Sequence, residues 1–110
     1  PPPPPPPLPS ANGIFPLSRL TYPKDAQDSG AAGEWVGQVR FSAGGGTPQV
    51  LNVMQATGNR SLDDYAERVM QRGLRYPTGT VDYVAKVTVR FSGAPDYEVD
   101  IIVSDIDYAE

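Results

Sequence analysis

The sequence predicts an α+β fold, in which a small antiparallel sheet of three to four strands is packed by two helices in the order α-β-β-α-β-β. Two observations carry this prediction. Residues 81–91 and 97–103 alternate between apolar and polar side chains, which is the period of a strand with one buried face. Residues 62–74 instead repeat their apolar side chains every three or four positions, which is the period of a helix.

The composition excludes several classes of function. The 110 residues include no Cys and no His, which excludes disulfides, Cys or His metal sites, and His- or Cys-based nucleophilic catalysis. We therefore expect no enzyme, no metal and no cofactor. The net charge is -4, and every charged side chain from Asp96 to Glu110 is acidic. A nucleic-acid binder needs a basic stripe, and the basic residues here are few and scattered, so no nucleic acid is expected as a partner.

The N-terminal part of the chain predicts a Pro-rich linker at residues 1–13, followed by one folded domain at residues 14–110. A Pro run cannot donate backbone hydrogen bonds and has a fixed φ, so we expect a stiff polyproline II spacer. The same run can be a ligand for SH3-type or WW-type grooves, although the spacer is the favoured interpretation. A chain that begins in a Pro run without Met is expected to be a piece of a longer protein.

The first helix is expected over residues 21–30. Pro23 suits the first turn of a helix and Gly30 suits its end. Tyr22 and Ala26 are four residues apart, so both can face the sheet. At two turns, this helix needs support from the rest of the fold.

Residues 34–42 and 49–56 predict two strands joined by a loop. In the first strand Trp35, Val39 and Phe41 share one face. The Gly-rich residues 43–48 predict a flexible hairpin loop, because no Lys-Ser/Thr pair follows as a phosphate-binding loop requires. The pattern of the second strand is mixed. It allows either a bulge or the burial of Leu51 and Val53 on the core side.

The main helix is expected to begin near Leu62. Ser61 has Asp64 three residues later, which is a variant of the capping box, and Pro77 and Gly79 indicate where the helix has ended. The apolar side chains should lay this helix across the sheet, and they are Leu62, Tyr65, Ala66, Val69 and Leu74.

The last two strands form the clearest unit of the sequence. The joint at residues 92–96 contains Gly and Pro, so the second run can fold back on the first and lie at or near a sheet edge. The acidic residues of the last strand have two interpretations of about equal weight. Glu98, Asp100, Asp105 and Asp107 either prevent aggregation at the edge or recognise a partner.

Taken in order, a set of residues resembles the C-terminal domain of TonB energy transducers. The match covers roughly residues 22–91, and no single motif in it is strongly specific. The matching residues are Tyr22-Pro23 and Ala26, Gly33-Glu34 and Val36, Val39 and Phe41, Val50 and Val53, Gly58, Leu62-Asp63, Leu74-Arg75-Tyr76, and Val87, Val89 and Phe91.

The resemblance implies a function, a location and partners. TonB proteins have an inner-membrane anchor, a stiff Pro-rich span across the periplasm, and a C-terminal domain that captures an extended plug segment of an outer-membrane receptor. The expected partners are therefore such a TonB-dependent receptor and, through an anchor outside this chain, the inner-membrane motor proteins. The expected role is to pass motor force to the receptor for the uptake of nutrients such as siderophores.

The residues expected to bind the partner lie in two segments. The first corresponds to the family's approach segment, and its residues are Arg19, Leu20, Thr21 and Tyr22. The second is the backbone edge of residues 97–106, represented by Tyr97, Val99, Ile101, Val103 and Asp105. A captured segment would add there as a strand, unless the last strand is a cover that must move to open an edge at residues 81–91.

Other functions remain open at this point. A TolA-like envelope domain and a secretion or pilus assembly module can both use a small α+β domain with a Pro-rich linker. An edge that binds strands can also pair with itself, so a homodimer is a further expectation.

Overall fold

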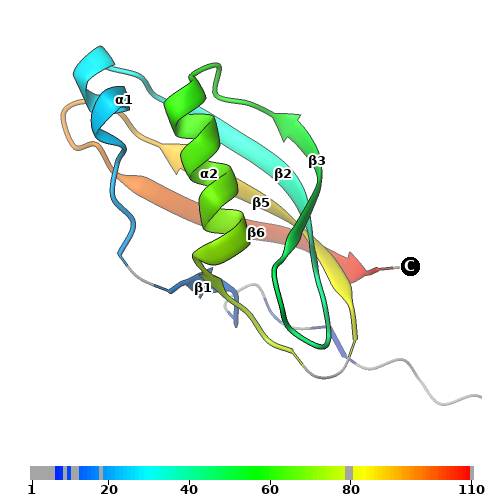
Figure 1. Ribbon diagram of the computed structural model, residues 1–110. Coiled ribbons are helices and arrows are strands. Elements are labelled where there is room, and N and C mark those ends of the chain that lie inside the picture. The colour runs from blue at the N-terminus through cyan, green and yellow to red at the C-terminus, as the bar shows by residue number, and fades with distance from the viewer. Residues whose placement is uncertain (1–6, 9, 11–12, 18, 79–80, 110) are drawn as a thin grey trace, which may run out of the picture.

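The computed structural model describes residues 7–8, 10, 13–17, 19–78 and 81–109, and these residues form an α+β domain (Figure 1). Its elements in chain order are β1 (Phe15–Pro16), α1 (Lys24–Ser29), β2 (Gly33–Phe41), β3 (Gln49–Gln55), α2 (Arg60–Arg72), β4 (Leu74–Arg75), β5 (Tyr83–Phe91) and β6 (Val99–Tyr108). The predicted mixture of helix and antiparallel sheet is confirmed.

The predicted element order is wrong in one respect, because two short strands were not expected. β1 and β4 pair with each other in a separate antiparallel sheet of two strands. The pairing is continued by the Leu17 N–H, which donates to the Gly73 carbonyl at 2.7 Å. A strand of two residues has no readable period, so the sequence pattern does not reveal it. Leu74, predicted as the end of the main helix, is a buried residue of β4.

The main sheet has the strand order β3-β2-β5-β6 and is antiparallel throughout. β2 and β5 form its centre and pair without interruption from Gly33↔Phe91 to Phe41↔Tyr83. β3 and β6 are the two edge strands, so the expectation that the last strand lies at a sheet edge is confirmed.

One face of the sheet is packed under α2 (Figure 1). The predicted inward residues Trp35, Val39 and Phe41 of β2 are all buried. The helix contributes Leu62, Ala66, Val69 and Met70. The opposite face carries ion pairs instead. Arg90 of β5 pairs with Glu34 of β2 at 2.8 Å, and Arg40 of β2 pairs with Asp82, just before β5, at 2.7 Å.

The start of α2 differs from the prediction at Ser61. The cap residue is Asn59, whose side-chain oxygen accepts a hydrogen bond from the Leu62 N–H at 3.2 Å. Asp63 accepts from the Thr57 N–H at 2.8 Å and from the Thr57 hydroxyl at 2.7 Å, which fixes the turn before the helix. Asn is as good a cap as Ser, so the helix begins two residues earlier than expected.

α1 lies inside the predicted residues 21–30 but is shorter, and Pro23 is its N-cap residue rather than part of its first turn. Pro23 immediately precedes it, and Gly30 ends it with a left-handed φ of 69° that a residue without a Cβ adopts without strain. Ala26 is fully buried and Tyr22 almost so. Neither this helix nor α2 is long and apolar enough to cross a membrane.

The expected linker lies mostly outside the described residues, at 1–6, 9 and 11–12. Within its described part, Leu8 packs partly buried against the core. Ile14 is 4% exposed and belongs to the core itself.

Candidate functional site

The approach segment, residues 19–22, connects β1 to α1 and is held at two points. The Thr21 N–H donates to the Tyr65 hydroxyl of α2 at 3.0 Å. The Tyr22 ring is buried, and its hydroxyl donates to the Ala31 carbonyl. Burial raises the pKa of this hydroxyl, and the neighbouring Tyr97 acts in the same direction. Tyr22 therefore positions the segment from beneath, while Arg19 and Thr21 stay exposed.

The turn before β6 is held against the approach segment by aromatic contacts. The Tyr22 ring meets Phe91 edge-on, with centroids 5.7 Å apart, and meets Tyr97 edge-on at 5.2 Å. The turn is closed by the Tyr97 N–H, which donates to the Gly93 carbonyl at 2.8 Å, and by the Ser92 N–H, which donates to Glu98 at 3.0 Å. Tyr97 itself has a φ of 48°, which is uncommon for a residue other than Gly.

A hollow of about 520 Å³ opens where the approach segment meets the start of β6. We call it the approach hollow. It is lined by Pro16, Arg19, Leu20, Asp96, Tyr97, Glu98, Val99 and Asp100. Four of the residues predicted from sequence thus come together here: Arg19, Leu20, Tyr97 and Val99. They are separated by about eighty positions in the chain and are joined only by the fold.

The approach hollow combines exposed acidic side chains, which we call its rim, with two half-buried apolar side chains. Asp96, Glu98 and Asp100 are all exposed, and Arg19 is the one basic residue in the lining. Leu20 and Val99 are half-buried and pack against the core. Such a surface favours an extended segment that carries both apolar and basic side chains.

The other predicted residues lie outside this hollow. Thr21 and Tyr22 line a neighbouring one of about 530 Å³, together with residues of α1 and α2. Ile101 and Val103 lie further along β6, opposite Val89 and Val87 of β5, and are half-buried against the core. Their side chains therefore pack against the core rather than lining a hollow.

Asp105 lies at an irregularity of β6. The register with β5 shifts between Val84 and Lys86, and Asp105 has a φ of 52° in the same region. Such a bulge interrupts pairing and turns an edge strand away from a neighbour. The regular stretch of β6 is therefore Val99 to Ser104, which pairs with β5 residue by residue.

Comparison with protein-family models, curated proteins and solved structures gives no match.

Sequence reasoning did not assign the rim carboxylates to a site with Arg19 and Leu20. The sequence signal for these carboxylates was the excess of acidic residues after Pro95. For the approach segment, residues 19–22, the one signal was the family resemblance described above. Among the described residues, no group of three or more carboxylates has the arrangement of a metal site. The chemistry that this arrangement supports is binding through backbone hydrogen bonds, apolar contacts and charge.

Proposed function

We propose that this chain is the receptor-binding C-terminal domain of a TonB-like energy transducer. In this proposal, an extended segment of an outer-membrane receptor adds as a strand along Val99 to Ser104, and its leading side chains enter the approach hollow. The observation that carries the proposal is that this hollow adjoins the start of an edge strand. Main-chain hydrogen bonds supply affinity, and the hollow selects side chains.

Addition to the free edge of β6 is favoured over displacement of β6. Val99, Ile101 and Val103 are partly buried against the core, and their removal would also uncover Val87 and Val89 of β5. Exposing a buried aliphatic side chain costs about 1.5–3 kcal/mol when its burial is complete. Addition to the free edge keeps these contacts and covers more surface.

The proposal also gives the domain its place between two membranes. A domain that transmits force must stay bound to its partner under load. Strand addition along an edge provides several main-chain hydrogen bonds for this binding. The stiff Pro-rich run would hold the domain away from its anchor, and the receptor would receive force through the added strand.

The test is a calorimetric titration of the 110-residue chain with synthetic peptides copied from plug segments of TonB-dependent receptors. We expect a peptide with a basic residue to bind, and Asp100→Lys to weaken its binding at least fivefold because the rim charge is reversed. Asp28→Lys is the matched control, since Asp28 is an exposed acid of α1 that does not line the approach hollow. Absence of binding, or equal binding by the two variants, would refute the proposal.

A further inference from the structure

The second edge of the sheet, formed by β3, has a surface unlike that of β6. Its exposed apolar side chains are Leu51, Val53 and Met54, which are 46%, 38% and 51% exposed. We call these three residues the β3 patch. The expected burial of Leu51 and Val53 is therefore wrong, and the alternative expectation of a bulge is confirmed.

Two bulges produce the β3 patch. The register between β2 and β3 shifts once between Val36 and Gly37 and again between Gln38 and Val39. The residues without a partner in this register are Met54 and Leu51. Bulges re-aim side chains, and here the two extra residues are the most exposed apolar side chains of the strand.

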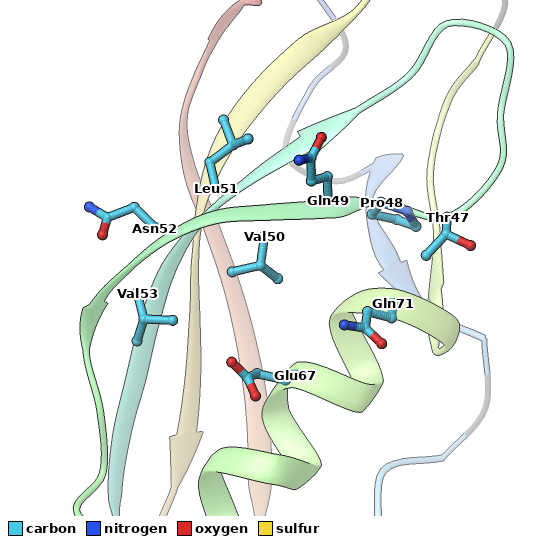
Figure 2. A pocket seen from close by; sticks show the side chains of 9 residues that line it. All are labelled: Thr47, Pro48, Gln49, Val50, Leu51, Asn52, Val53, Glu67 and Gln71. Carbon is cyan, nitrogen blue, oxygen red and sulfur yellow. The ribbon is translucent and has the colours of Figure 1, made fainter.

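A hollow of about 610 Å³ lies beside the β3 patch, between β3 and α2. Figure 2 shows Val50 pointing from the strand toward α2, while Leu51 points to the other side. Glu67 and Gln71 of α2 form the polar side of this hollow. The edge strand thus presents apolar side chains on both sides of an unpaired backbone.

The charge of this region is compatible with a second copy of the same chain. No Asp, Glu, Lys or Arg occurs from Ser42 to Asn59, a stretch that includes the whole of β3. The chain as a whole is acidic, and its other edge carries Asp100, Asp105 and Asp107. Two copies that met through β6 would bring these carboxylates together, whereas two copies that meet through β3 bring no like charges of the strands together.

We propose that the β3 patch is the interface between two copies of this chain. A two-fold arrangement uses the same surface on both copies, so the exposed apolar side chains of one β3 patch meet those of the other. The interface leaves β6 and the approach hollow free, and it does not depend on the proposed receptor binding.

The test is sedimentation of the 110-residue chain, without any peptide, over a range of concentrations. We expect the average mass to rise toward twice the monomer mass. Leu51→Lys should remain monomeric at concentrations where the unmodified chain is dimeric. The matched control is Ile102→Lys on the other edge strand, where Ile102 is 41% exposed, and it should dimerise like the unmodified chain.

Amide hydrogen exchange of the unmodified chain gives a second measurement that needs no variant. Exchange of residues 49–55 should slow as the concentration rises, while exchange of residues 99–108 stays constant. A mass that stays at the monomer value, slowing confined to residues 99–108, or equal dissociation by the two Lys variants would overturn the proposal. Because no peptide is present, these results are independent of the receptor-binding test.

Discussion

The side chain of Trp35 in β2 leaves no room for a Cβ at position 37, two residues later in the same strand. Trp35 and Gly37 share the inner face of the strand, and the indole ring lies over Gly37, so a methyl group there would overlap the far edge of the ring. Trp35 is 1% exposed, so its ring is enclosed by the core. The need for Gly therefore comes from packing rather than from backbone conformation.

We predict that Gly37→Ala lowers the free energy of unfolding by about 1–3 kcal/mol, the usual effect of overpacking a core. The control is Gly44→Ala in the hairpin loop, where a Cβ meets nothing within 4 Å. This control should be neutral or slightly stabilising. Urea unfolding of both variants measures the difference, and equal stabilities would contradict the packing argument.

The hydroxyl of Tyr83 couples stability to alkaline pH. It donates to the Pro77 carbonyl at 2.8 Å, and burial, together with the nearby Tyr76, raises the pKa of Tyr83 to about 12. The ordinary pKa of Tyr is about 10, so the unfolded chain ionises first as the pH rises. The contribution of this group to stability is therefore complete below about pH 10 and is lost between about pH 10 and pH 12.

We predict that Tyr83→Phe lowers stability by about 1 kcal/mol at pH 8, through the lost hydrogen bond. The difference between the two chains should shrink by pH 11, since only the unmodified chain has Tyr83 to ionise. Tyr22 is present in both chains and cancels in the comparison. Urea midpoints at the two pH values measure the effect, and a difference that stays constant would contradict the coupling.

Among the elements, α2 depends on a cap that sequence reasoning assigned to the wrong residue. Asn59 accepts the hydrogen bond from the Leu62 N–H, and Ser61 is already inside the helix. We predict that Asn59→Ala lowers the free energy of unfolding by about 1 kcal/mol. Ser61→Ala should change it by less than about 0.5 kcal/mol, as is usual for a side chain without a special role. If Ser61→Ala lowered the thermal unfolding temperature more than Asn59→Ala, Ser61 and not Asn59 would be the cap.

How far the fold follows from sequence differs between elements for physical reasons. β5, β2 and the buried face of α2 were predicted because their burial follows a regular period over nine or more residues. The exposure of Leu51 was not predicted. Each bulge moves every later residue of β3 to the other face of the sheet, so the strand has no simple period to read. β1 and β4 are too short to have a period.

The candidate site was predictable only in part for a similar reason. The edge position of β6 was expected from the joint at residues 92–96, which lets this strand fold back on β5 as a hairpin. The proximity of Arg19 to Tyr97 depends instead on the contact between the Tyr22 and Tyr97 rings, which is made by tertiary packing. No local pattern in either segment encodes that contact.

On the scale of the whole molecule, the two edges of one sheet have opposite character. β6 is acidic and adjoins the approach hollow, whereas β3 is uncharged and exposes apolar side chains. With β6 paired along β5, the receptor segment of the proposed function would have two ways to join the sheet from this side. It can extend the sheet beyond β6, or it can replace β6.

A reversible link between β5 and β6 distinguishes these two modes. The chain contains no Cys, so a pair introduced at Thr88 and Ile102 can form only one disulfide within the molecule. These residues are direct cross-strand partners on the face opposite α2, and such partners lie within the range of Cα separations that a disulfide tolerates.

We predict that the oxidised Thr88→Cys/Ile102→Cys chain binds a receptor-plug peptide within twofold of the reduced chain, because in the proposed function the segment docks on the free edge of β6 and leaves β6 in place. Oxidation should also raise the thermal stability, since the link joins two strands that already pair. Calorimetric titration before and after reduction measures both forms of one sample, so differences in folding are controlled. If oxidation abolished binding and reduction restored it, β6 would be a cover that leaves β5 when the receptor segment enters.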